Sequence, residues 1–214
     1  MNLKKRLMIM KKIVFATIPM QKITPQHYVS EENKSIEYEG KVRFPINAVL
    51  AKTLAKDDEV KVVRIVTKSE FAQENVDFQK EELDGINAAI GAHITYDEVQ
   101  DEFKETSDVV ESRFRKIVAT FEEGCQIFAD MTYGPKTLVP VLFFALGFAE
   151  RFFDADISHI VYGAIVHDEN KQAKANTAAL YDVTPLFYLN SLTSVMEAPD
   201  GKTAIERLNK FFEL

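Results

Sequence analysis

The sequence contains a single cysteine, Cys125, and no tryptophan among its 214 residues. One thiol cannot form an intrachain disulfide, and it cannot supply a zinc site built from several cysteines, so both kinds of stabilised scaffold are excluded. The lack of disulfides fits a reducing, intracellular compartment. We therefore expect a cytoplasmic protein in which Cys125 is a small buried hydrophobic residue.

Glycine is also scarce, with eight residues, no two of which lie two positions apart. The dinucleotide fingerprint Gly-x-Gly-x-x-Gly is therefore missing, and so are the phosphate loop Gly-x4-Gly-Lys-Ser/Thr and the metal motif His-Glu-x-x-His. These absences disfavour an NAD-dependent enzyme, an ordinary NTPase and a zinc hydrolase. We expect neither a bound cofactor nor a metal site.

Long hydrophobic runs are missing as well. The most apolar run, residues 138–149, has 12 residues and includes a proline. A membrane span needs about 20 residues, so this run is better explained as a buried helix and no membrane association is expected. The first residues contain neither a long apolar stretch nor a small-residue cleavage site, so we expect no signal peptide. Residues 1–9 are expected to be a loose extension.

Negative charge predominates: 26 Lys and Arg against 33 Asp and Glu give a net charge of −7. Residues 1–12 hold five basic residues and no acid, so residues 13–214 retain 21 basic against 33 acidic residues, a net charge of −12. A body this acidic is a poor candidate for tracking long DNA or RNA, which requires a broad basic surface. A local pocket for a small anionic ligand is compatible with it.

Short apolar runs alternate with stretches of helical spacing. This pattern predicts an α/β, Rossmann-like protein with a mainly parallel sheet of about six strands and helices on both faces. The predicted strands are 13–18, 60–67, 92–96, 125–130, 159–166 and 178–183. The predicted helices are 46–54, 70–90, 107–123, an apolar one ending near 153, 185–197 and 201–213. We also expect a surface hairpin with arms at 27–30 and 35–39.

The segment Asp130-Met131-Thr132-Tyr133-Gly134-Pro135-Lys136 follows a predicted strand and leads into the apolar helix. Ligands of open α/β sheets bind at the carboxyl ends of the strands. Gly134 permits a close approach of the backbone or a positive φ, and Pro135 suits the first turn of a helix. The free N–H groups and the dipole at the start of a helix attract an anion.

Three side chains of this segment add ligand chemistry. Thr132 supplies a hydroxyl, Tyr133 a ring able to stack on a base, and Lys136 an ammonium group suited to phosphate. The alternative, which the residues leave open, is a capped turn in which Asp130 is only a structural hydrogen-bond acceptor.

Three other segments have more than one explanation. The loop Thr17-Ile18-Pro19-Met20-Gln21-Lys22 should lie beside Gly134 if the first and fourth strands are neighbours, although an ordinary surface turn explains it better from the residues alone. The segment 182–186, Asp-Val-Thr-Pro-Leu, is typical of a strand end, an N-cap and a proline at the first helical position, so a structural role is favoured. The acid-rich stretch 97–105 is expected to be a solvated face rather than a metal site.

Together these segments resemble the CARF (CRISPR-associated Rossmann-fold) family of type III CRISPR systems, from Ile13 to about Ala198. The most specific match is residues 130–136. The family typically has an acid or amide, an aliphatic residue, Thr or Ser, often His or Gly, then Gly, any residue, and Arg or Lys. Tyr133 stands where the family more often has His or Gly. Residues 162–164, Tyr-Gly-Ala, and 182–186 also resemble the family, whereas the loop after the first strand matches in position more than in residue type.

The resemblance implies a CARF-like domain at 13–198, after a basic extension at 1–12 and before a C-terminal helix at 199–214. It further implies a homodimer that binds cyclic oligoadenylate, the second messenger made when a type III complex detects foreign RNA. A symmetric, polyanionic ring matches two copies of one pocket across a two-fold axis. In the implied site, Thr132, Gly134 and Lys136 hold phosphate and ribose, with Asp130 and Tyr133 beside them. Thr17, Ile18 and Met20 line the adenine side.

Most members of this family carry an output domain, whereas residues 199–214 leave room for one helix. Stand-alone members can be ring nucleases, which cleave the messenger without a metal by attack of a ribose 2′-hydroxyl on the adjacent phosphate. In that reaction Lys136 would stabilise charge and Thr17 or Thr132 would orient the ribose. The residues separate neither binding from cleavage nor cyclic tetra-adenylate from hexa-adenylate. The alternative is a non-catalytic regulatory or docking subunit whose basic segment, residues 1–12, binds a protein partner.

Overall fold

The computed structural model describes residues 11–166, 168–169, 174 and 176–213. The chain forms two compact units, which divide between Thr184 and Pro185. The first unit is an α/β fold around one six-stranded sheet of order β3-β2-β1-β4-β5-β6, in which only β5 and β6 pair antiparallel. The strands are β1 (Lys11–Thr17), β2 (Glu59–Thr67), β3 (His93–Asp101), β4 (Gln126–Asp130), β5 (Asp156–Ala164) and β6 (Ala179–Asp182). This confirms the predicted mainly parallel, Rossmann-like sheet.

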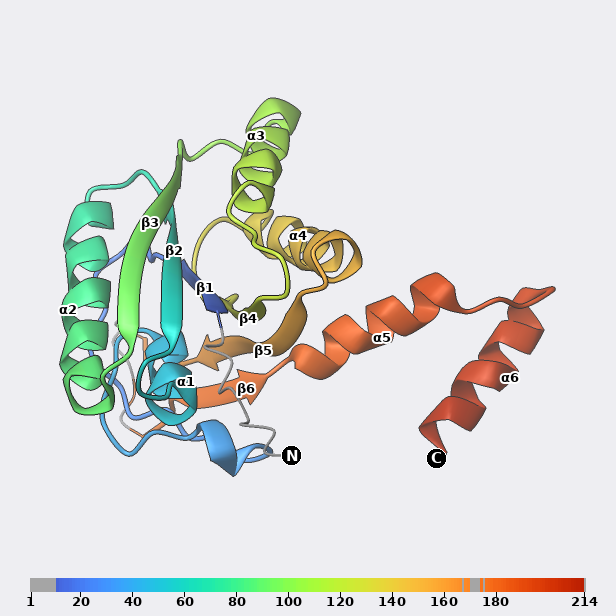
Figure 1. Ribbon diagram of the computed structural model, residues 1–214, viewed down its shortest axis with the longest axis horizontal. Coiled ribbons are helices and arrows are strands. Elements are labelled where there is room, and N and C mark those ends of the chain that lie inside the picture. Colours follow the sequence, from blue (N-terminus) through green and yellow to red (C-terminus); the bar gives the residue numbers. More distant parts are fainter. Residues whose placement is uncertain (1–10, 167, 170–173, 175, 214) are drawn as a thin grey trace, which may run out of the picture. The chain divides into compact units, whose positions relative to one another are not determined.

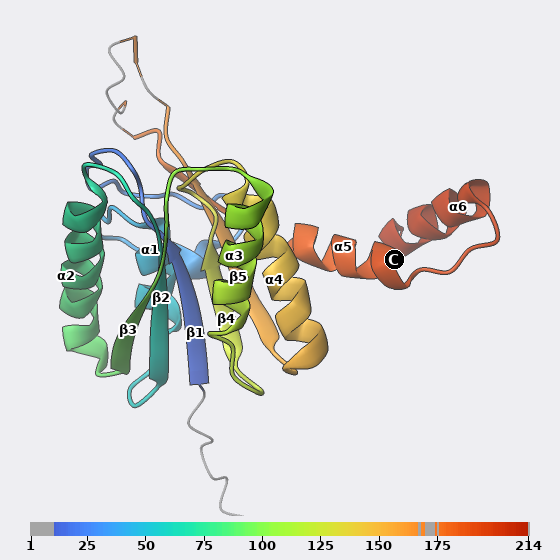
Figure 2. The ribbon, with the colours of Figure 1, turned by 90° about the horizontal axis from the view of Figure 1, so that it is seen from above.

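Helices cover both faces of the sheet. Those of the first unit are η1 (Lys34–Ile36), α1 (Pro45–Thr53), α2 (Ala72–Ile90), α3 (Ser107–Val118), α4 (Leu138–Phe152) and the start of α5 (Thr184–Val195). Figures 1 and 2 show α1 and α2 on one side of the strands and α3 and α4 on the other. In β1 every residue from Lys12 to Thr17 is buried, as expected for a strand covered on both faces.

The topology places a switch point between β1 and β4. These two strands are parallel neighbours, with Phe15 paired to Ala129. In the sheet, β2 and β3 lie beyond β1, and β5 and β6 lie beyond β4. The connections after β1 and β4 therefore run to opposite faces, which leaves a crevice beyond their carboxyl ends. Thr17 and Asp130 end the two strands at this place.

The beginning of the described chain belongs to the sheet. Lys11 and Lys12 lie in β1 rather than in a basic extension. The buried Lys12 Nζ contacts Asp58 Oδ2 at 2.6 Å and the Thr53 carbonyl at 2.9 Å, and Lys11 pairs with Glu122. The rest of the expected extension, residues 1–10, lies outside the described residues.

The prediction of a surface hairpin over residues 27–39 is wrong. That segment contains the short helix η1 instead. The reason lies in two polar side chains: Asn33 Oδ1 accepts a hydrogen bond from the Ser35 N–H, and Glu37 Oε2 accepts one from the Ser30 N–H. Side chains that bond to nearby backbone in this way compete with a strand ladder.

Several element boundaries also differ from expectation, such as that of β5, which begins at Asp156 and ends at Ala164. β3 continues to Asp101, and α3 already ends at Val118. α4 begins at Leu138, so Pro135 precedes the helix instead of occupying its first turn; its carbonyl accepts a hydrogen bond from the Leu138 N–H. Cys125 is fully buried, as predicted.

The second unit, from Pro185 on, contains the rest of α5 and the helix α6 (Gly201–Phe212). Asp200 caps α6, because its Oδ1 accepts a hydrogen bond from the Thr203 N–H at 2.8 Å. No residue of α6 is buried. Among the described residues of the whole chain, no helix combines the length and apolar character needed to cross a membrane.

Candidate functional site

The structure brings together the two segments that the sequence singled out at the switch point. We call residues Asp130–Lys136, which connect β4 to α4, the 130–136 corner. The Tyr133 N–H of this corner donates a hydrogen bond of 3.1 Å to Thr17 Oγ1 at the end of β1. The loop after β1 therefore lies beside the corner, as expected if β1 and β4 are neighbours.

Asp130 anchors the corner from within the protein. Its side chain is fully buried, and its Oδ1 accepts a hydrogen bond of 2.8 Å from the Thr132 N–H. Its Oδ2 has no hydrogen-bond partner among the described residues. Burial raises the pKa of Asp130 to about 6, although Thr132 and the nearby N–H of Ile46, at the start of α1, oppose the rise. Asp130 thus has the structural role that the sequence left open.

Thr132 ties the corner to the next strand. Its Oγ1 accepts a hydrogen bond of 2.9 Å from the Gly163 N–H in β5. Gly163 is required here, because an added Cβ would lie 2.3 Å from the Pro45 side chain. The resemblance between residues 162–164 and the CARF family thus falls on a segment that directly supports Thr132.

Tyr133 points into the protein. Its hydroxyl donates to the Arg43 carbonyl at 2.9 Å, and its ring meets Phe44 edge-to-face, with ring centres 6.3 Å apart. Burial raises the pKa of Tyr133 well above its ordinary value. The ring would have to leave these contacts before it could stack on a base.

The accessible part of the corner is its second half. Gly134 has a φ of +102°, and a Cβ at that position would lie 2.6 Å from Leu138 Cδ2, so a glycine is required. The side chain of Lys136 is exposed. Within the described part of the chain, the N–H groups of Gly134 and Lys136 have no hydrogen-bond partner. The corner therefore offers two free N–H donors and one cation.

The loop after β1 is held in place by a residue that the sequence analysis missed. Asn75 of α2 is buried, and its Nδ2 donates to the carbonyls of Pro19 and Gln21 at 2.8 and 2.9 Å. Ile18 is buried, whereas Met20 is partly exposed. Of the residues expected on the adenine side, Met20 is therefore the more accessible, and Thr17 is only 1% exposed.

The acid-rich stretch is only partly the solvated face that we expected. Asp97 and Glu98 are exposed, but Asp101 is buried. Its carboxylate contacts Arg113 Nε at 3.3 Å and Lys116 Nζ at 2.5 Å, which joins the end of β3 to α3. In the part of the chain that the structure describes, no group of three or more His, Cys, Asp or Glu residues is arranged to hold a metal ion.

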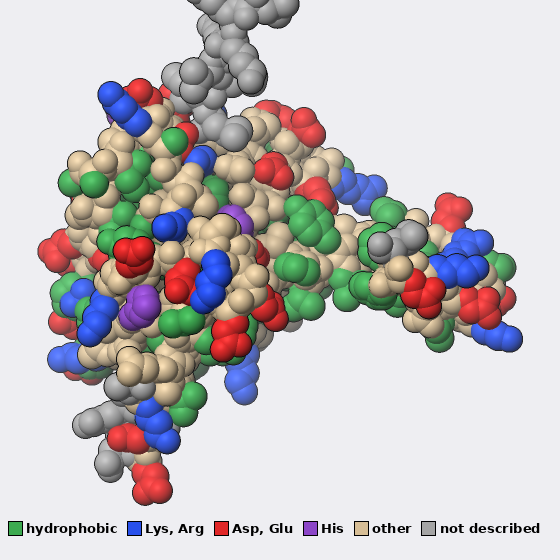
Figure 3. All heavy atoms as spheres, turned by 90° about the horizontal axis from the view of Figure 1, so that it is seen from below, with side chains coloured by type: hydrophobic (Ala, Val, Ile, Leu, Met, Phe, Trp, Pro, Cys, Tyr) green, Lys and Arg blue, Asp and Glu red, His purple; other side chains and the backbone are tan. Residues whose placement is uncertain are grey.

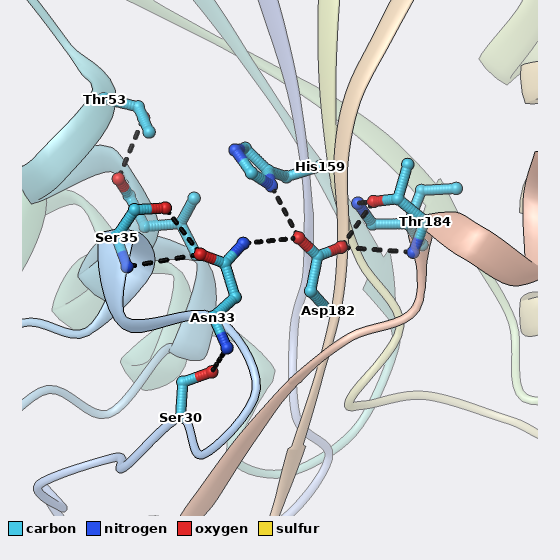
Figure 4. Close-up of polar contacts among 9 residues, drawn as sticks. Ser30, Asn33, Ser35, Thr53, His159, Asp182 and Thr184 are labelled. Atoms are coloured by element: carbon cyan, nitrogen blue, oxygen red, sulfur yellow. Dashed lines mark hydrogen bonds and ion pairs between the residues drawn. The ribbon is translucent and has the colours of Figure 1, made fainter.

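A second polar cluster surrounds Asp182 at the end of β6 (Figure 4). Its Oδ2 contacts His159 Nδ1 at 2.9 Å and accepts a hydrogen bond of 3.0 Å from Asn33 Nδ2. Its Oδ1 accepts bonds from the N–H and hydroxyl of Thr184, whose own oxygen accepts one from the Ile160 N–H. Asp182 thus joins η1, β5 and the start of α5, in keeping with the structural role expected for residues 182–186.

Replacing Asp182 with asparagine should destabilise the protein by about 1–2 kcal/mol at pH 7, after allowance for solvent screening. Burial works to raise the pKa of Asp182, but hydrogen bonds from His159 and Thr184 outweigh it and lower the pKa to about 2. The stabilisation of the fold by ionised Asp182 is therefore complete above the ordinary carboxyl pKa of about 4 and is lost as the pH falls toward 2.

Urea unfolding of wild type, Asp182→Asn and the exposed control Asp156→Asn between pH 2.5 and 7 measures this effect. The stability gap between wild type and Asp182→Asn should narrow at acidic pH, while the control stays close to wild type throughout. A gap that is constant with pH would show that Asp182 makes no charge-dependent contribution.

The surface charge agrees with the composition. On the face drawn in Figure 3, Lys and Arg side chains are interspersed with Asp and Glu and form no broad basic stripe. That face does not offer the continuous positive surface that a long nucleic acid requires.

No family model matches the chain, and a search of the curated proteins finds no relative.

Proposed function

We propose that this protein binds cyclic oligoadenylate at the 130–136 corner and acts as a messenger sensor of type III CRISPR defence. The observation that carries the proposal is the free half of the corner. At the switch point of the sheet, the unpaired N–H groups of Gly134 and Lys136 lie next to the exposed Lys136 ammonium. Backbone donors, a cation and the adjacent start of α4 form a favourable site for a phosphate group.

The hydroxyls of Thr17 and Thr132 support the same assignment. Each oxygen accepts one backbone hydrogen bond, from Tyr133 and from Gly163. The Thr132 hydroxyl also bonds to the Asp130 carboxylate, so it donates to a ligand only by exchanging that bond. Thr132 is partly exposed and adjoins the free half of the corner. It is the better placed of the two to bond a ribose or phosphate oxygen, whereas Thr17 becomes accessible only if the loop after β1 moves.

A cyclic ligand with repeated phosphates is best bound by two copies of the corner, so the proposal includes a homodimer. The edge of the sheet near the corner carries an apolar pair suited to such pairing. Tyr162 and Tyr181 are stacked with ring centres 6.3 Å apart, and they are 43% and 47% exposed. Tyr162 adjoins Gly163, which bonds to Thr132. A two-fold interface that covers this pair would bring two corners toward each other.

Ring cleavage is the proposed extension of binding. The ribose 2′-hydroxyl loses its proton to solvent as its oxygen attacks the adjacent phosphorus. The bond from phosphorus to the 5′-oxygen breaks, this oxygen takes up a proton from solvent to become a hydroxyl, and a 2′,3′-cyclic phosphate is left. The contribution of the protein would be to align attacking and leaving oxygens and to stabilise the charge on the phosphoryl oxygens. Lys136 and the Gly134 N–H serve the charge, and Thr132 orients the ribose.

Calorimetry of the full chain with cyclic tetra-adenylate and cyclic hexa-adenylate tests the binding function. The proposal predicts saturable heat for at least one ring. Absence of heat for both would refute it. Chromatography of the ring after long incubation in EDTA then separates sensor from nuclease, because linear products with a cyclic phosphate appear only if the ring is cleaved.

A docking subunit is the second candidate, favoured by α6. Ile205, Phe211 and Phe212 of this helix are 61%, 53% and 63% exposed, an apolar face typical of surfaces that bind another protein. Under this alternative, neither messenger ring produces heat, while a protein partner is captured by the intact chain.

A further inference from the structure

A side chain of the protein itself sits at the start of α4. Glu105 belongs to the loop between β3 and α3, and its Oε1 accepts a hydrogen bond of 3.0 Å from the Thr137 N–H. Thr137 is the N-cap of α4. The first N–H groups of a helix have no partner within the helix and attract negative charge. The Glu105 carboxylate therefore lies where an anionic ligand of the corner would bind.

A buried arginine faces the same place. Arg113 of α3 is 1% exposed, its Nε pairs with Asp101, and its Nη1 donates to Thr137 Oγ1 at 3.4 Å. Its Nη2 has no partner among the described residues. Burying a hydrogen-bond donor without a partner costs free energy of folding. The Arg113 guanidinium contacts Thr137 at the start of α4 and keeps one nitrogen unpaired, which indicates a site for an additional acceptor.

We propose that the Thr137 N–H, Arg113 and Lys136 form a phosphate subsite, and that Glu105 occupies it until a phosphate group displaces the carboxylate. The inference rests on the proposed function, because the phosphate would be one of those in the messenger ring. A carboxylate offers two oxygens, whereas a phosphodiester can add charge-assisted bonds to a guanidinium and an ammonium group.

The electrostatics of Glu105 agree with this geometry. The hydrogen bonds from Thr137 are the main cause that lowers the pKa of Glu105, and the positive charges of Arg113 and Lys136 lower it further. Both cations therefore act on the carboxylate that occupies the subsite. Since Glu105 is exposed, it can leave the subsite without breaking the core.

The variant Glu105→Gln tests the subsite, because it removes the competing charge and keeps the size of the side chain. Glu102→Gln is the matched control, since Glu102 lies in the same loop and its carboxylate pairs with the exposed Lys68. In ¹⁵N-resolved NMR of the full chain, the Thr137 amide should move in Glu105→Gln before any addition. Inorganic phosphate should then shift it at a concentration roughly three- to tenfold lower than in wild type and in the control.

Two results would overturn the inference: equal phosphate affinity in wild type and Glu105→Gln, or no shift of the Thr137 amide in Glu105→Gln at about 50 mM phosphate. Arg113→Lys, which keeps the charge but removes the fork of donors, should weaken phosphate binding in the Glu105→Gln background. Unchanged binding in that double variant would also count against the subsite.

Calorimetry with the messenger rings separates this inference from the proposed function. If wild type binds a ring and Glu105→Gln binds it no more tightly, the function stands and the subsite fails. If the phosphate titration succeeds and neither ring binds, the subsite stands and the proposed function fails.

Discussion

Replacing Lys136 with alanine should weaken the binding of cyclic oligoadenylate by roughly ten- to a hundredfold, the effect of losing a hydrogen bond to a charged group. The ammonium group of Lys136 is exposed beside the two free N–H groups of the corner, so its removal deletes the only side-chain cation of the 130–136 corner. The fold should be unaffected, because the side chain is on the surface. Calorimetry measures the loss directly.

Lys52→Ala is the matched control. Lys52 is an exposed lysine in the last turn of α1, and the neighbouring Thr53 carbonyl contacts Lys12 near the beginning of β1, at the opposite end of the sheet. The control should bind the ring like wild type. Raising the salt concentration should weaken the wild type more than Lys136→Ala, because salt screens the lost attraction. If Lys136→Ala and Lys52→Ala bind equally well, Lys136 does not contact the ligand.

Replacing Asp130 with asparagine should make the protein more resistant to unfolding at neutral pH. The Asp130 carboxyl has a pKa of about 6 in the folded protein, against about 4 in an unfolded chain. A raised pKa means that the contribution of Asp130 to stability is complete below pH 4 and is lost as the pH rises through 6. The loss amounts to about 3 kcal/mol at most, since each pKa unit corresponds to about 1.4 kcal/mol.

Asparagine carries no charge, so Asp130→Asn should not show this loss. Its carbonyl can still accept the Thr132 N–H, and its amide occupies the position of the unpaired Oδ2. Urea unfolding at pH 4 and pH 7 measures this effect. From pH 4 to pH 7 the free energy of unfolding of Asp130→Asn, relative to that of wild type, should rise by up to about 3 kcal/mol, while that of the exposed control Asp97→Asn should not rise. An unchanged difference would mean that folding does not raise the pKa of Asp130.

The central strands of the sheet could be predicted from local patterns, because β1, β2 and β4 are almost entirely buried. Residues 60–67 form a mostly apolar run with little alternation, and β2 (Glu59–Thr67) contains all of them. The prediction of a hairpin at 27–39 was wrong because Asn33 and Glu37 bond to nearby backbone N–H groups. Such bonds compete with strand pairing, and a hydropathy pattern does not show them.

The location of the corner could be predicted, but the directions of its side chains could not. A strand, a glycine and a lysine before an apolar helix indicate a ligand-binding turn. Tyr133 points inward because its hydroxyl bonds to the Arg43 carbonyl, 90 residues away in the sequence. The Thr137 N–H at the start of α4 is bonded by Glu105, which lies 32 residues earlier. Contacts at such separations leave no local trace.

One missed residue did leave a signal. Asn75 lies among the apolar residues Ala72 and Val76 on the buried face of α2. A polar side chain on a buried helix face needs hydrogen-bond partners, and Asn75 finds them in the loop after β1. Searching predicted helices for such residues would have connected α2 to the candidate site.

The most direct measurement is an NMR titration of the full chain with cyclic tetra-adenylate and cyclic hexa-adenylate, followed at the Gly134 and Lys136 amides. If the corner binds the messenger across a two-fold axis, both amides shift with one of the rings and saturate at one ring per two chains. If they remain unshifted at saturating concentrations of both rings, the corner is not a messenger site.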